Sequence, residues 1–115
     1  MTSTAAIGRA GEERARRAYV ARGYEVVAQN VRIARVEVDL VVRRGDELLF
    51  VEVKLKRGDA WGDPLEMVDG RKLHRLRRAA EAWLADHPGD RGCEVAIEVL
   101  ALSPGKVERV RDTGS

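Results

Sequence analysis

Residues 36–54 read VEVDLVVRRGDELLFVEVK, two aliphatic arms separated by a Gly-Asp pair. Arms rich in β-branched and aliphatic residues favour β-strands. Glycine supplies the positive φ angle that a tight turn between two antiparallel strands requires. The stretch therefore predicts a β-hairpin whose two central turn residues are Gly45 and Asp46.

Counting outward from this turn, the predicted register places Asp39 directly opposite Glu52. Side chains alternate between the two faces of a strand, so one face of the hairpin is wholly aliphatic and the other is charged at its far end. The aliphatic face consists of Val38, Leu40, Val42, Leu49, Val51 and Val53. The other face runs from Val41 and Phe50 near the turn to Glu37, Asp39, Glu52 and Lys54.

Two carboxylates opposed across a ladder, with β-carbons roughly 5 Å apart, destabilise the pair unless a positive charge compensates them. A divalent cation or a lysine would do so, and Lys54 lies on the same predicted face. From the residues alone three interpretations stay open. The cluster is an unfavourable accident, a solvated end of the sheet, or a metal site with Lys54 beside it.

Length and composition limit the class of protein. The chain has 115 residues, which predicts a single domain over 1–115 with a flexible tail from about 112 to 115. Charged residues are 35% of the chain but nearly cancel, to a net charge of +2, so global charge alone does not indicate nucleic-acid binding. The single cysteine, Cys93, excludes an internal disulfide and a multi-cysteine zinc site.

The sequence also favours a cytoplasmic protein. No apolar run approaches the roughly 20 residues needed to span a bilayer. The N-terminus lacks the hydrophobic segment of a secretory signal. We therefore expect no membrane contact.

Periodicity and capping signals predict a helix on each side of the hairpin. The first runs from about 4 to 22 and ends at Gly23, where a left-handed cap is common. The second is predicted over 63–86, and the Asp69-Gly70 pair marks either a kink or a second start. Strands are predicted over 24–31 and 93–102, with a further short edge strand over 106–110.

Glu12 is the anomalous residue on the inner stripe of the first predicted helix. The rest of that stripe is small or aromatic: Gly8, Gly11, Ala15 and Tyr19. In one interpretation Glu12 is an exposed carboxylate paired with Arg16 one turn later. In the other, the helix brings Glu12 over the charged end of the hairpin as a third acid.

The second predicted helix carries five basic residues within eight positions and no acid among them. A charged outer face is ordinary on a surface helix. Alternatively, the helix and the loop before it form a positive strip that contacts phosphates and releases counterions. The candidate nucleic-acid-binding residues in this strip are Lys56, Arg57, Lys72, Arg75 and Arg78.

Carboxylate oxygens with no soft ligands nearby suit a hard cation such as Mg²⁺ or Mn²⁺. Such an ion activates water and polarises a phosphoryl oxygen. Lys54 beside it would position the attacking water or neutralise the charge of the transition state. The combination of Asp39, Glu52 and Lys54 therefore fits phosphodiester hydrolysis.

The order Asp39, then Glu52-x-Lys54, across a hairpin resembles the PD-(D/E)xK nuclease superfamily. More narrowly, the chain resembles the YraN-like family of small uncharacterised bacterial proteins, which are similar to archaeal Holliday-junction resolvases. One departure is Val36, where the family usually has glycine. The matching landmarks are Gly11-Glu12 with Ala15, Gly23-Tyr24, Asn30-x-Arg32, Glu37-x-Asp39-Leu40, Phe50-Val51-Glu52-Val53-Lys54, Gly62-x-Pro64-x-Glu66 with Lys72, and the strand from Cys93 to Val99.

This resemblance implies an α/β, restriction-endonuclease-like core, a mixed β-sheet flanked by helices in the order α-β-β-β-α-β. It implies Asp39 and Glu52 as ligands of Mg²⁺ or Mn²⁺, Lys54 as the catalytic lysine and Glu12 as a further acidic ligand. The implied activity is metal-dependent cleavage of structured or branched DNA, by a homodimer because paired nicks need two active sites. Two alternatives stay open: a non-catalytic nucleic-acid-binding module, and an interaction protein whose carboxylates and Lys54 form a structural ion-pair network.

Overall fold

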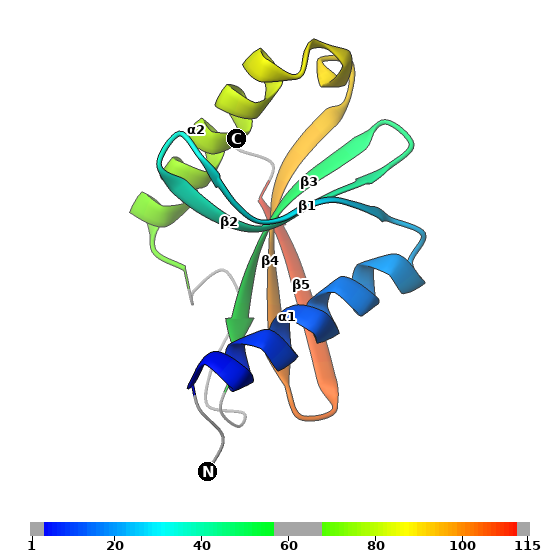
Figure 1. The fold of residues 1–115 in the computed structure, drawn as a ribbon, viewed down its shortest axis with the longest axis vertical. Coiled ribbons are helices and arrows are strands. Elements are labelled where there is room, and N and C mark those ends of the chain that lie inside the picture. Colours follow the sequence, from blue (N-terminus) through cyan, green and yellow to red (C-terminus); the bar gives the residue numbers. More distant parts are fainter. Residues whose placement is uncertain (1–3, 57–67, 113–115) are drawn as a thin grey trace.

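Two helices enclose a five-stranded mixed sheet in the computed structural model, which describes residues 4–56 and 68–112 (Figure 1). The elements are α1 (Thr4–Ala21), β1 (Glu25–Ile33), β2 (Val36–Arg44), β3 (Glu47–Leu55), α2 (Gly70–Asp86), the short 3₁₀ helix η2 (Pro88–Asp90), β4 (Glu94–Ser103) and β5 (Lys106–Asp112). The predicted α/β class, consistent with a restriction-endonuclease-like fold, is confirmed, and β5 adds the further edge strand to the order.

The sheet follows chain order, β1-β2-β3-β4-β5. Neighbouring strands are antiparallel except β3 and β4, which are parallel and paired from Glu47 opposite Glu94 to Leu55 opposite Leu102. A parallel pair requires a crossover connection, and α2 lies in this one. The β2–β3 hairpin therefore lies at the centre of the sheet.

The predicted hairpin register is confirmed near the turn. Pairs run from Arg44 opposite Glu47 to Leu40 opposite Val51, and Gly45 has the expected positive φ of 61°. Two predictions about its faces are wrong. Asp39 lines a hollow beside α1, whereas Glu52 and Lys54 line a hollow beside α2, so the two acids do not share one face. Val38 does not share a face with Leu40 but packs in the cluster beneath α2. The regular alternation of β2 is broken between these two residues, at Asp39.

Each face of the sheet is covered by one helix. Ala15 and Tyr19 of α1 pack on a cluster that includes Leu49 and Leu100. Leu76 and Trp83 of α2 pack on the opposite cluster, whose strand residues are Ile33, Val38, Val41, Leu48, Phe50 and Ile97. The sheet is therefore a central layer that can present residues to either helix.

The described part of α2 begins at Gly70, and Asp69 is its N-cap, accepting a hydrogen bond from the backbone N–H of Lys72 at 3.0 Å. The predicted start at Asp63 and Pro64 lies outside the described residues. Asp112, predicted to lie in the tail, instead belongs to β5 and pairs with Ile97. Within the described ranges, neither helix is long and apolar enough to cross a membrane.

Candidate functional site

The predicted acid pair lies where β2 and β3 separate. Leu40 and Val51 are the last paired residues of this ladder. Beyond them, Oδ2 of Asp39 accepts a hydrogen bond from the backbone N–H of Val53 at 2.7 Å. The Asp39 carboxylate thus satisfies a backbone donor of β3, and Asp39 and Glu52 do not form the direct cross-strand pair that the sequence predicted.

Asp39 lines a small hollow of about 130 Å³ beside α1. The hollow is lined by Gly8, Gly11, Glu12, Asp39, Val53 and Leu55. Gly11 permits the close approach of the helix, because a β-carbon there would lie 2.9 Å from Cδ2 of Leu55. The structure therefore brings Glu12 to the same hollow as Asp39.

The Glu12 side chain is held by β1 rather than by its own helix. It accepts a hydrogen bond from Nδ2 of Asn30 at 3.0 Å, and Asn30 has a positive φ of 49°. The alternative of a Glu12–Arg16 pair is wrong, because Arg16 instead forms an ion pair with Glu13 at 2.7 Å. Of the two interpretations of Glu12, the position over the charged end of the hairpin agrees with the structure.

Glu52 lines a different hollow, of about 400 Å³, beside α2. Its Oε1 lies 4.0 Å from Nζ of Lys54, and its Oε2 lies 3.6 Å from Nζ of Lys72. The residue is 8% exposed, and Oε2 is buried without a hydrogen-bond partner among the described residues. The lining of this hollow is Glu52, Lys54, Val68, Asp69, Arg71, Lys72 and Arg75.

Burial and neighbouring charges shift the pKa of both acids. Burial raises the pKa of Asp39, while the Val53 N–H and the charge of Lys72 oppose the rise. Burial also raises the pKa of Glu52, the charge of Asp39 raises it further, and Lys72 and Lys54 oppose both effects. Each carboxylate is thus charged at a cost that a nearby cation would relieve.

The donor set at this end of the sheet fits a magnesium or manganese ion. All the candidate ligands are oxygens, and the buried Oε2 of Glu52 has a lone pair that no described donor uses. Magnesium typically takes one or two protein carboxylates and keeps several waters. Residues 4–56 and 68–112 contain no group of three or more His, Cys, Asp or Glu arranged to hold an ion, so Glu12, Asp39 and Glu52 are not a preformed three-ligand set.

The predicted basic strip is only partly assembled. Arg75 and Arg78 are exposed on α2, and Arg75 also lines the Glu52 hollow. Lys56 is instead buried and forms an ion pair with Glu108 at 3.0 Å, which removes it from the surface available to phosphates. Arg57 lies outside the described residues.

The structure brings Lys72 to the acid site. It was predicted as a phosphate contact, but its ammonium lies at the acid site, where it also donates a hydrogen bond to the backbone carbonyl oxygen of Glu37 at 3.4 Å. The N-cap signal at Asp69 is the feature of the sequence that could have predicted this position, because it fixes Lys72 in the first turn of α2. That turn follows directly on residues lining the Glu52 hollow.

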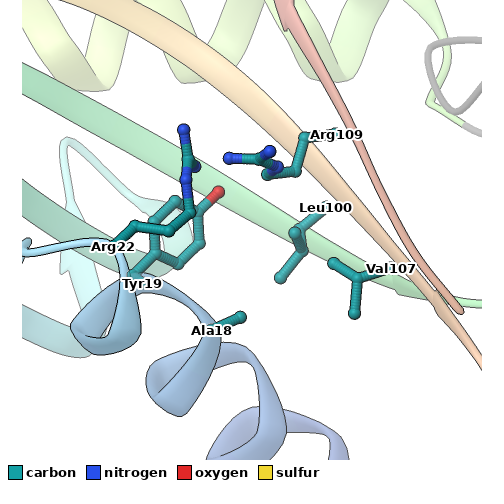
Figure 2. A pocket seen from close by; sticks show the side chains of 6 residues that line it. All are labelled: Ala18, Tyr19, Arg22, Leu100, Val107 and Arg109. Atoms are coloured by element: carbon teal, nitrogen blue, oxygen red, sulfur yellow. The ribbon is translucent and has the colours of Figure 1, made fainter. Parts of the chain in front are cut away.

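Another hollow, of about 230 Å³, lies between the C-terminal half of α1 and the β4–β5 hairpin. Figure 2 shows the guanidinium groups of Arg22 and Arg109 at the same end of it. The Tyr19 hydroxyl donates to the buried carboxylate of Glu98 at 2.7 Å, and Glu98 also accepts from Nε of Arg111 at 3.2 Å. These bonds anchor α1 to the sheet, and none of the candidate acids lines this hollow.

Comparison with known proteins gives one family. The model of the uncharacterised protein family UPF0102 matches residues 11–110. A UPF0102 protein of Beutenbergia cavernae is 44% identical over 119 residues, which cover 99% of this chain and 100% of the relative. A UPF0102 protein of Frankia casuarinae is 41% identical over 116 residues, covering 96% of this chain and 98% of the relative. The matched range, residues 11–110, spans the positions of Glu12, Asp39, Glu52 and Lys54.

Proposed function

This chain belongs to the uncharacterised protein family UPF0102, the YraN family. On that premise we propose that it is a metal-dependent endonuclease, which hydrolyses phosphodiester bonds in structured or branched DNA. One observation carries the proposal. Glu52 is a buried carboxylate with an oxygen that accepts no hydrogen bond from the described residues, and the charge of Asp39 adds to its own. Such a pair favours a hard cation.

In this proposal Asp39 and Glu52 hold Mg²⁺ or Mn²⁺, and Glu12 approaches from α1. The bound ion supplies an activated water and a polarised phosphoryl oxygen. Lys54, whose Nζ lies 4.0 Å from Oε1 of Glu52, orients the attacking water or neutralises charge that develops on the phosphate. The Val53 N–H keeps the Asp39 carboxylate oriented at the end of the ladder.

The substrate approaches along α2. Arg75 lines the Glu52 hollow and Arg78 is exposed on the same helix, so both can contact phosphates next to the acid site. We include a homodimer in the proposal, because paired nicks in a branched substrate need two active sites. Light scattering of the purified chain tests that part separately.

The test is a panel of substrates against metal ions: flaps, four-way junctions, single strands and RNA, each with Mg²⁺, Mn²⁺ or EDTA. We expect cleavage of at least one DNA substrate with a divalent ion, and its loss in Asp39→Ala and in Glu52→Ala with the fold intact by circular dichroism. Asp46→Asn, in the exposed hairpin turn, is the matched control and should cleave like the wild type. Cleavage that persists in both acid-site variants would reveal a contaminant and reject the assignment.

A non-catalytic nucleic-acid-binding module is the second candidate. It is favoured by Arg75 and Arg78, which are exposed on α2 and can contact phosphates whether or not the acids hold a metal. It predicts salt-dependent binding that survives Asp39→Ala, with no cleavage under any metal condition.

A structural ion-pair network is the third candidate, favoured by the two lysines that flank Glu52. It predicts no affinity for nucleic acid even at low salt. A clear mobility shift of branched DNA by the purified chain rejects this third candidate.

A further inference from the structure

We propose that Lys72 is a resident counter-ion of the acid site, and that a divalent cation must displace its ammonium group to bind Glu52. The inference rests on the proposed function and adds a residue that controls it. Lys72 would then set the affinity for the metal, while Lys54 remains beside the metal and acts in the reaction.

The position of the Lys72 ammonium carries the argument. Its Nζ lies 3.6 Å from Oε2 of Glu52, the same oxygen that is buried and accepts no hydrogen bond from the described residues. The same Nζ donates to the carbonyl oxygen of Glu37 at 3.4 Å. Lys72 therefore places its charge among carboxylate and carbonyl oxygens, which are the ligands that a hard cation prefers.

The side chain of Lys72 can also move its ammonium group out of this position. Its backbone is fixed, because its N–H donates to the Asp69 carboxylate at the N-cap of α2. Its side chain is 32% exposed and ends in a compact charge on a flexible four-carbon stem. The ammonium can therefore move toward solvent while the helix stays in place.

Lys54 differs from Lys72 in the oxygen that it approaches. Lys54 comes from β3 and lies 4.0 Å from Oε1, the other oxygen of the Glu52 carboxylate. A cation at Oε2 would thus meet the Lys72 charge first. Two positive charges at one oxygen repel, so the ammonium and the metal exclude each other there.

Displacement of the Lys72 ammonium would also affect the binding of phosphate groups. Arg71 and Arg75 line the same hollow, so an ammonium released from Glu52 joins a set of positive charges. A phosphate in that hollow would stabilise the released position. Phosphate binding and metal binding would then favour each other, with Lys72 as the shared element.

The experiment measures Mn²⁺ affinity of the full chain without nucleic acid, by isothermal titration calorimetry with manganese chloride. We expect Lys72→Met to bind Mn²⁺ about tenfold more tightly than the wild type, because a unit charge 3.6 Å from the ligand oxygen no longer opposes the ion. Lys72→Arg keeps the charge and should bind no more tightly than the wild type. Arg75→Met removes the same charge from the same hollow without an ion pair to Glu52, and should change the affinity much less.

The outcomes separate this inference from the proposed function. If the wild type binds Mn²⁺ and Lys72→Met binds it equally or more weakly, Lys72 does not compete and the inference alone is overturned. Equal tightening in Lys72→Met and Arg75→Met, or in Lys72→Met and Lys72→Arg, also overturns it. If no variant binds Mn²⁺, both the inference and the metal-dependent function fail.

Discussion

At the scale of the residue, Glu52 is a buried carboxylate whose charge lowers the stability of the fold. The residue is 8% exposed, and burial and the charge of Asp39 both raise its pKa against the opposing effect of two lysines. A carboxylate placed for stability would show the opposite shift, as Glu13 does, whose bond to Arg16 holds its pKa near 2. Glu52 is therefore a carboxylate whose charge opposes folding, as the proposed cation site would require.

The first prediction concerns the stability cost of this residue. At pH 7 we expect Glu52→Gln to raise the free energy of unfolding by roughly 0.5–2 kcal/mol, since it removes a buried charge while keeping the shape. Urea unfolding followed by circular dichroism measures the change. Asp46→Asn, which removes an exposed charge from the hairpin turn, is the control and should change stability little.

The pH dependence of this effect has a definite sign. Above the ordinary Glu pKa of 4.5 and up to the raised pKa of Glu52, the folded chain binds more protons than the unfolded chain. The contribution of Glu52 to stability therefore falls as pH rises through that window. The gain in Glu52→Gln should grow over the same window, and a gain that shrinks with rising pH would contradict the assignment.

At the scale of the element, α1 is positioned by small residues at one end and by a polar anchor at the other. Gly11 lets the helix approach Leu55 beside the acid site. Tyr19 binds Glu98 of β4 across the sheet face. The two ends of the helix can be tested separately.

The second prediction compares two glycines of α1. Gly8→Ala should stabilise the chain by about 0.5–1 kcal/mol, because alanine favours the helix and a β-carbon there meets nothing within 4 Å. Gly11→Ala should give a smaller gain, because its β-carbon would displace the half-exposed side chain of Leu55. Thermal and urea unfolding of both variants measure the difference. An equal gain at the two positions would show that the approach at Gly11 is not constrained.

The third prediction concerns the anchor. Burial raises the pKa of the Tyr19 hydroxyl, so it stays protonated and donates to Glu98. Tyr19→Phe should lower the free energy of unfolding by about 1–3 kcal/mol, because a buried acceptor loses its donor while Arg111 still compensates the charge. Tyr24→Phe, which loses a bond to the less buried Glu47, is the control and should cost less.

Features of the fold that depend on local contacts could be predicted from the sequence, whereas features that depend on contacts between distant residues could not. The hairpin register from Arg44 to Leu40 follows from a turn and an alternating pattern, which are local. The reversal at Val38 accompanies a hydrogen bond from the backbone of β3 to the Asp39 side chain, a contact between strands that the alternating pattern of β2 does not show. The burial of Lys56 likewise depends on Glu108, distant in the sequence.

At the scale of the whole molecule, the helices differ in which of their arginines are paired, although the net charge of the chain is only +2. On α1, Arg16 and Arg17 both pair with Glu13. On α2, Arg77 pairs with Asp112, but Arg75 and Arg78 have no ion pair with the residues that the structure describes. Arg9 and Arg14 of α1 also have no ion pair among the described residues, but they do not line the Glu52 hollow, whereas Arg75 does.

The fourth prediction follows from this asymmetry. Replacing both Arg75 and Arg78 by alanine should weaken binding of branched DNA and reduce the slope of log K against log salt by about 2, because two phosphate contacts are lost. Fluorescence anisotropy over a series of salt concentrations measures the slope. The matched control is Arg16→Ala with Arg17→Ala, which removes the same charge from α1, where Glu13 already compensates it. If the control reduces the slope equally, DNA binding depends on the total charge of the chain rather than on a surface of α2. The proposal that nucleic acid approaches along that helix would then be wrong.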